Sequence, residues 1–172
     1  MAFYIRKISP AKWPQKGEAT AVCDVRADAV TGDIRTTQDT ISLWRIDTLE
    51  ELDQAVLALA SGGDKAVTYN VLTIPEETLL KYGFILAETD GNTPVDGLAK
   101  THRDVVGVNY GSLGKFTQLI MEAINADKLC TITKKQVKSL IVKAYKNGEI
   151  NRDKLKERMR EEIEEELKKE VG

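Results

Sequence analysis

The chain has 172 residues, of which 42% are hydrophobic and 30% are charged, and its formal net charge is −2 at pH 7. This composition supports one domain, or one domain with an appendage, and the small net charge excludes a global electrostatic attraction to nucleic acid or membranes. No apolar run reaches the roughly 18 residues of a membrane-spanning helix. The N-terminus also lacks the basic, apolar and small regions of a signal peptide, so we expect a cytoplasmic protein.

Five segments of the first half have strand composition, because they are rich in β-branched and aromatic residues and are bounded by Gly, Pro, Asp or Thr. These segments are residues 3–8, 20–25, 40–46, 66–74 and 84–87. Between them, a capping box at Thr48 predicts one helix, and Pro75 opens a short helix that stops at Gly83. Residues 26–35 are a further candidate helix. These elements predict a mixed β-sheet with helices on one or both faces.

The second half begins near Thr93, where the following proline opens a helix by occupying its first turn. Apolar residues keep one face from Val95 to Ile124, which predicts one long helix or two collinear helices. The opposite face carries glycines, among them Gly107 and Gly111, and each costs roughly 1 kcal/mol relative to alanine inside a helix. We expect close backbone packing there, a kink near Gly111, or a ligand or partner laid on the glycines.

Two later helices start with the same device, a side-chain cap flanked by apolar residues that pack together. Thr133 provides the first cap and Asn151 the second. Gly148 supplies a left-handed stop between them. The pattern predicts a helical hairpin, with one helix over residues 133–147 and the other from Asn151 onward.

Together these patterns predict an α+β fold. We expect a sheet domain over residues 1–92 and a helical region over residues 93–172, formed by the long helix and the hairpin. Residues 90–92 predict a tight turn and not a flexible linker. The helical region should therefore pack on the sheet domain or on a partner chain.

The last helix carries an apolar stripe whose members recur every four positions, so the stripe winds around the helix axis. Such a stripe must be buried, either on the hairpin partner or on another chain. Because no catalytic signature accompanies these helices, the leading hypothesis is a non-enzymatic interaction or regulatory protein that contacts a protein partner or a second copy of itself. The expected partner-binding residues are Leu155, Met159, Ile163, Leu167, Gly107 and Gly111.

The helix over residues 133–147 contains five lysines and no carboxylate. Such a face can contact phosphates, and Lys134, Lys135 and Lys138 are the candidates for binding nucleic acid. Alternatively, the glutamates of the last helix neutralise these lysines within the chain, or the lysines are simply solvated or meet an acidic protein partner.

The order of features in residues 3–87 resembles that of small ADP-ribosyltransferase-like folds. Arg6 lies on the first strand, residues 32–37 lead into the strand that contains Ser42, and a helix and a strand follow. The resemblance implies an enzyme that handles NAD or a nucleotide, with Glu76 or Glu77 near the nicotinamide ribose. If the chain is an enzyme, the catalytic candidates are Arg6, Ser42, Glu76, Glu77 and His102.

The remaining reactive side chains suggest structural roles. His102, the only histidine, falls on the apolar face of the predicted long helix, as a partly buried hydrogen-bonded residue, a pH-sensitive contact or a catalytic group. Cys23, in a predicted strand, and Cys130 lack a CxxC partner, so both should be reduced structural thiols. Acidic loop residues such as Asp33 should be solvated, with a carboxylate magnesium site as the alternative. We predict no zinc site, no other metal site and no cofactor.

Overall fold

The computed structural model describes residues 1–18 and 21–171, and its centre is a six-stranded sheet in the order β4-β5-β2-β1-β3-β6. The strands are β1 (Phe3–Ile8), β2 (Ile41–Ile46), β3 (Tyr69–Pro75), β4 (Ile85–Glu88), β5 (His102–Val106) and β6 (Leu129–Ile132). The helices are α1 (Ala27–Asp33), α2 (Leu52–Ser61), α3 (Glu76–Lys81), α4 (Tyr110–Asn125), α5 (Lys134–Lys146) and α6 (Glu157–Val171). The α+β class predicted from the sequence is confirmed.

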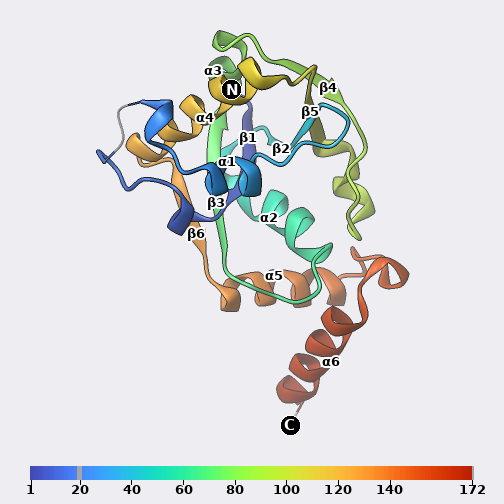
Figure 1. The fold of residues 1–172 in the computed structure, drawn as a ribbon. Coiled ribbons are helices and arrows are strands. Elements are labelled where there is room, and N and C mark those ends of the chain that lie inside the picture. Colours follow the sequence, from blue (N-terminus) through green and yellow to red (C-terminus); the bar gives the residue numbers. More distant parts are fainter. Residues whose placement is uncertain (19–20, 172) are drawn as a thin grey trace.

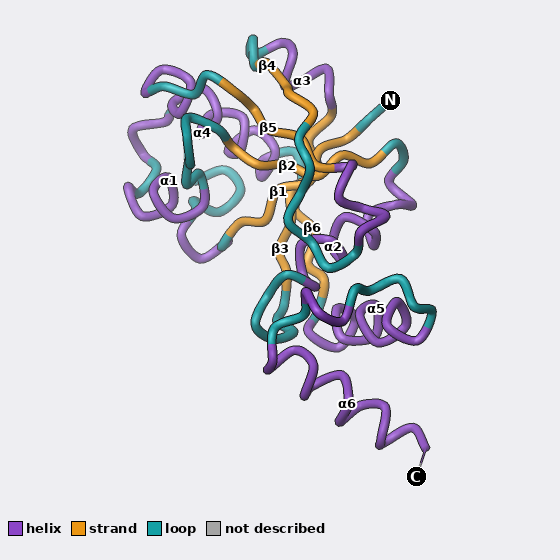
Figure 2. Tube along the Cα trace, turned by 90° about the vertical axis from the view of Figure 1, so that its right-hand side faces the viewer, coloured by secondary structure: helices purple, strands orange, loops and turns teal. Residues whose placement is uncertain are grey.

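The sheet lies between two helical layers because side chains alternate along its strands. On β1, Tyr4 and Ile8 enter one half of the core, whereas Ile5 enters the other. Helices α1 and α4 lie on the first side of the strands and α2 and α5 on the second (Figure 1, Figure 2). None of the described helices has the length and apolar character needed to cross a bilayer.

Local signals in the sequence placed several elements correctly. Strand β1 has the predicted bounds, and the predicted strands at 40–46, 66–74 and 84–87 correspond to β2, β3 and β4. Gly83, where α3 was expected to stop, has a φ of 77°. At the start of α5, the Thr133 Oγ1 accepts the Gln136 N–H at 3.3 Å and the Gln136 Oε1 accepts the Thr133 N–H at 2.9 Å. These features depend only on neighbouring residues, which is why the sequence predicts them well.

The strand predicted at residues 20–25 is wrong where the structure describes it. Val22–Asp24 form a 3₁₀ helix, and residue 20 lies outside the described residues. The Asp24 Oδ2 accepts the Ala21 N–H at 3.0 Å, and such a local side-chain bond competes with sheet formation. Cys23 is consequently exposed and is not a core thiol.

The long helix predicted over residues 95–124 is also wrong. A 3₁₀ helix, Asp96–Thr101, leads into β5, and α4 begins only at Tyr110. Gly107 takes a left-handed conformation with a φ of 68°, and the Asn109 Oδ1 caps α4 by accepting the Ser112 N–H at 3.0 Å. A left-handed glycine and an N-cap two residues later cannot lie inside one continuous helix.

The sheet is antiparallel in all five strand pairs, whereas a mixed sheet was expected. The helical connection α2 joins β2 to β3, and such a crossover usually joins parallel neighbours. Here β2 and β3 do run in the same direction, but β1 lies between them and is antiparallel to both. Strands β5 and β6, from the part predicted to be helical, extend the same sheet at either side.

The predicted hairpin is present, but its second helix starts later than expected. Asn151 caps a 3₁₀ turn, Arg152–Lys154, and α6 follows from Glu157. Leu155 at the turn and Met159 on α6 are no more than 2% exposed, so the start of α6 is anchored in the core. The rest of α6 points away from the sheet (Figure 1).

Candidate functional site

The candidate site lies where β1 and β2 separate. Their last paired residues are Ile5 and Trp44, although both strands continue beyond this point. The Arg6 side chain bridges the gap: its Nη1 donates to the Ser42 carbonyl at 2.7 Å, and its Nε donates to the Asp33 carbonyl at 3.1 Å. The Arg6 Nη2 donates to the same Asp33 carbonyl. Arg6 therefore ties β1 to β2 and to the end of α1.

The Asp33 carboxylate is buried beside this arginine, at 8% exposure. Its Oδ2 accepts the Ser9 N–H at 2.7 Å and the Trp13 Nε1–H at 2.8 Å, and its Oδ1 accepts the Ser9 hydroxyl at 2.9 Å. The expectation of a solvated loop carboxylate is wrong for Asp33, because three donors surround it. Among the side chains that the structure describes, no three of His, Cys, Asp or Glu gather in a way that could hold a metal ion.

A cleft of about 420 Å³ opens at this separation of the strands. Its size lies in the range of roughly 300–1,000 Å³ that is typical of small-molecule sites. Its lining combines apolar residues with polar and cationic ones. The apolar residues are Ile5, Trp44 and Leu59, and the other lining residues are Arg6, Lys7, Ser9, Lys12, Gly32, Asp33 and Ser42.

The charge of the lining favours an anion. Burial lowers the pKa of Arg6, and the nearby Asp33 charge opposes this shift, but a guanidinium stays protonated in proteins. Of its five N–H groups, three are used by the Asp33 and Ser42 carbonyls, which leaves two for a ligand. Lys7 and Lys12 add two further cations, and within the described chain neither forms an ion pair. The Lys7 Nζ lies over the Tyr69 ring, 4.3 Å from its centroid. The Lys12 Nζ lies against Gly32, where an added Cβ would be only 2.5 Å away.

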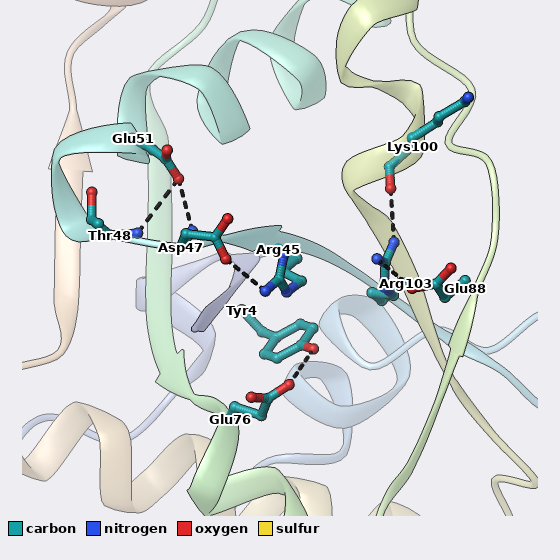
Figure 3. Close-up of polar contacts among 9 residues, drawn as sticks. All are labelled: Tyr4, Arg45, Asp47, Thr48, Glu51, Glu76, Glu88, Lys100 and Arg103. Carbon is teal, nitrogen blue, oxygen red and sulfur yellow. Dashed lines mark hydrogen bonds and ion pairs between the residues drawn. The ribbon is translucent and has the colours of Figure 1, made fainter. Parts of the chain in front are cut away.

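The structure brings together two of the predicted catalytic residues, Arg6 and Ser42, but not the acidic ones. The Glu76 Oε1 accepts the Tyr4 hydroxyl at 3.0 Å (Figure 3), near the start of β1 and away from the cleft lining. Glu77 is exposed at the start of α3 and also does not line the cleft. Neither glutamate therefore lies in the cleft, where the ADP-ribosyltransferase resemblance implies an acidic residue.

Two arginines near Tyr4 already have partners. Arg45 pairs with Asp47 at 2.6 Å, and Arg103 pairs with Glu88 at 2.9 Å (Figure 3). Both ion pairs use carboxylates of the same chain, so this cluster is not an open anion site.

His102 lies on β5 behind Trp44, and not on a helix as expected. The two rings meet edge to face with centroids 5.2 Å apart. Thr89 gives its one hydroxyl proton to the Asp104 Oδ2 at 3.0 Å, so its oxygen accepts the His102 Nδ1–H at 2.8 Å. The Asp104 Oδ1 accepts the Ser42 hydroxyl at 3.0 Å. His102 is therefore a buried, hydrogen-bonded residue outside the cleft lining.

The burial of His102 predicts acid sensitivity. Burial lowers the pKa of His102 from its usual 6.5, and the Asp104 charge opposes the shift. A depressed pKa in the folded state gives stability that is complete above the unfolded pKa and is lost as the pH falls through the folded pKa. We expect the Tm to fall below about pH 6.5, and His102→Gln to reduce that fall. Thermal melts of the parent and the variant from about pH 8 to pH 5 measure this pH dependence of the Tm. An equal fall of the Tm in both proteins would contradict the prediction.

The predicted partner-binding residues lie mostly inside the chain. Leu155, Met159 and Ile163 are no more than 2% exposed, and Leu167 packs half-buried against the same cluster. The expected stripe of glycines on one long helix is absent from the described residues. Gly107 lies in the loop before α4, and Gly111 lies in the first turn of α4.

The lysine candidates on α5 divide into paired and unpaired groups. Lys134 pairs with Glu162 at 3.7 Å and Lys138 with Glu166 at 2.9 Å, so the expected neutralisation by α6 occurs for these two. Lys135 is exposed and forms no ion pair with the described residues.

Sequence reasoning missed Lys7, Lys12 and Asp33 as parts of the site. The only local signal was Trp13, whose indole N–H needs a partner when the ring is buried. The partner, Asp33, is 20 residues away, and nothing in the spacing identifies it. No protein-family model, no curated protein and no solved structure matches this chain.

Proposed function

We propose that this chain is a non-enzymatic binding protein whose cleft binds a small phosphate-bearing organic anion, such as a nucleotide. The observation that carries the proposal is that three cationic residues, Arg6, Lys7 and Lys12, line one cleft. Asp33, the one carboxylate among the described lining residues, already accepts three hydrogen bonds. Three cations against one carboxylate leave the lining with an excess of positive charge for a ligand.

The lining residues define the ligand class. The remaining N–H groups of Arg6 match the oxygens of a phosphate, and the lysines act as point charges. Asp33 offsets one of the three cations, so a ligand with a single carboxylate would offset one of the two remaining charges, whereas a phosphate offsets more than one. Leu59 is partly exposed and would contact an organic part of the ligand, whereas Ile5 and Trp44, no more than 5% exposed, lie beneath it in the core.

The surroundings of the cleft support binding without turnover. Acid or base catalysis needs a titratable group within hydrogen-bond reach of the ligand. Among the described lining residues, Asp33 already accepts three hydrogen bonds, the Ser42 hydroxyl donates to Asp104, and the two lysines are assigned to ligand binding as cations. The His102 ring packs against Trp44 and does not line the cleft. The proposal shares nucleotide binding with the ADP-ribosyltransferase-like enzymes that residues 3–87 resemble, but it does not include their reaction.

Thermal shifts test this function. Inorganic phosphate, AMP, ADP and NAD are added separately, and a ligand at 100 times its Kd should stabilise the protein by roughly 2.7 kcal/mol. In the double variant Lys7→Gln/Lys12→Gln, we expect the affinity to fall about 10–100-fold, because each charge-assisted hydrogen bond contributes roughly 1.5–3 kcal/mol and part of it is replaced by water. Isothermal titration calorimetry gives the two Kd values.

The matched control is Lys81→Gln, because Lys81 is an exposed lysine on α3 outside the cleft lining. This variant should bind as the parent does. The absence of a shift with every ligand, or a shift that survives the double substitution, would contradict the proposed site. NAD incubated with the protein and then analysed by chromatography should remain unconsumed. Hydrolysis of NAD would overturn the proposal that the protein binds its ligand without turnover.

A further inference from the structure

A second groove, separate from the cleft, runs between α5 and α6. It has a volume of about 370 Å³. Four lysines of α5 line it, together with Val142 at its base and one carboxylate from α6, Glu166. The lysines are Lys135, Lys138, Lys143 and Lys146.

The positive charge in this groove exceeds what α6 neutralises. Glu166 is bound by Lys169 at 2.8 Å and by Lys138 at 2.9 Å, and these two bonds lower the pKa of Glu166 to about 2. Glu166 therefore stays charged and neutralises Lys138 in an ion pair. Lys135 and Lys143 are exposed and, in the part of the chain that the structure describes, form no ion pair.

The spacing of the lysines fits a linear ligand with repeated charges. An α-helix rises about 1.5 Å per residue, so the row from Lys135 to Lys146 extends for about 16 Å. Phosphates of one strand of B-DNA follow one another at about 3.4 Å along the duplex axis, so the row passes about five of them. A small anion would meet only a part of this row.

The groove offers phosphate contacts and little else. A protein helix that docks in a groove buries apolar anchors, but Val142, the apolar lining residue, is only 6% exposed. Single-stranded nucleic acid is bound by stacking on aromatic side chains, and the described lining contains none. From the row of lysines and this lining we infer that the α5–α6 groove binds the phosphate backbone of duplex nucleic acid without reading its sequence.

This binding should depend strongly on salt. Counterion release makes the logarithm of the binding constant fall with the logarithm of salt concentration, by roughly 0.9 for each phosphate contacted. Because the chain carries a net charge of −2, the attraction is local to the groove, and we expect binding mainly at low salt. The exposed glutamates of α6, Glu161, Glu164 and Glu165, should confine the duplex to the α5 side.

Fluorescence anisotropy with a labelled duplex at several salt concentrations tests the inference. The variant Lys135→Gln/Lys143→Gln removes the two unpaired cations and leaves the Lys138–Glu166 pair intact. We expect its salt slope to be lower by about 1.8 and its binding at low salt to be weaker. Lys135→Arg/Lys143→Arg should retain binding, because phosphate backbone contacts tolerate either cation.

The matched control is Lys81→Gln/Lys115→Gln, which makes the same charge change at two exposed lysines outside the groove. It should retain the parent's salt slope and affinity. No binding at low salt, or binding that ignores both salt and the α5 substitutions, would overturn the inference. If poly-glutamate displaced the labelled duplex as effectively as unlabelled duplex does, the groove would be assigned to acidic proteins instead. Nucleotide binding in the cleft should survive the α5 substitutions. A negative result for the groove therefore leaves the proposal for the cleft intact, and a negative result for the cleft leaves the groove intact.

Discussion

Replacing Asp33 with alanine should lower the free energy of unfolding by about 3–5 kcal/mol, because it leaves buried donors without partners. The Asp33 carboxylate accepts the Ser9 N–H, the Ser9 hydroxyl and the Trp13 indole N–H, and it lies beside the Arg6 guanidinium. Each unpaired buried donor costs roughly 1–3 kcal/mol, and water entering the cleft recovers a part of that. Urea denaturation followed by Trp fluorescence measures the change.

Two variants make this result specific to the network. Asp33→Asn keeps one acceptor oxygen, so we expect an intermediate loss. Asp28→Ala removes an exposed carboxylate from the first turn of the same helix, and the lost interaction with the helix dipole should cost only about 0.3–1 kcal/mol. Equal effects of Asp28→Ala and Asp33→Ala would show that the buried network contributes little.

Replacing Ile163 with alanine should destabilise the isolated chain by about 2–5 kcal/mol through lost burial and a residual cavity. Ile163 is only 1% exposed and belongs to the same core cluster as Val137 and Ile141 of α5. If the apolar stripe of α6 instead served a partner, the substitution would leave the stability of the isolated chain unchanged. Equilibrium urea unfolding distinguishes these outcomes.

Leu80→Ala is the matched control, because Leu80 is 58% exposed and its truncation should change stability by less than about 0.5 kcal/mol. The unfolding midpoint should also be the same at two protein concentrations tenfold apart, since burial within one chain is independent of concentration. A midpoint that rises with concentration would place the α6 stripe between chains.

Elements marked by a few adjacent residues or by strand composition could be predicted from the sequence, whereas β5, β6 and the pairing of the strands could not. The α5 cap at Thr133 needs only Gln136, and the stop after α5 needs only Gly148, which has a φ of 73°. By contrast, Val105 and Phe116 are both fully buried and fit a helical repeat. The left-handed Gly107 and the Asn109 cap lie between them, and they separate the strand of the first from the helix of the second.

The candidate site shows the same division. Arg6 and Ser42 were plausible from the sequence because each lies on a well-marked strand. Their meeting depends on β1 and β2 parting after Ile5, and the hydrogen bond from Arg6 to Asp33 joins residues 27 apart. Lys12 enters the cleft only because Gly32 leaves room for its ammonium. No local pattern encodes either condition.

The interior position of β1 has a consequence for biosynthesis. This first strand pairs with β2 on one side and with β3 on the other, up to Phe3 with Pro75. Closing so long a loop is entropically unfavourable before pairing offsets it, which slows folding. At a translation rate of about 5–20 residues per second, β1 leaves the ribosome several seconds before β3 is complete. During that interval a β-prone segment with both edges unpaired is available to chaperones, and to neighbouring nascent chains as a template for aggregation.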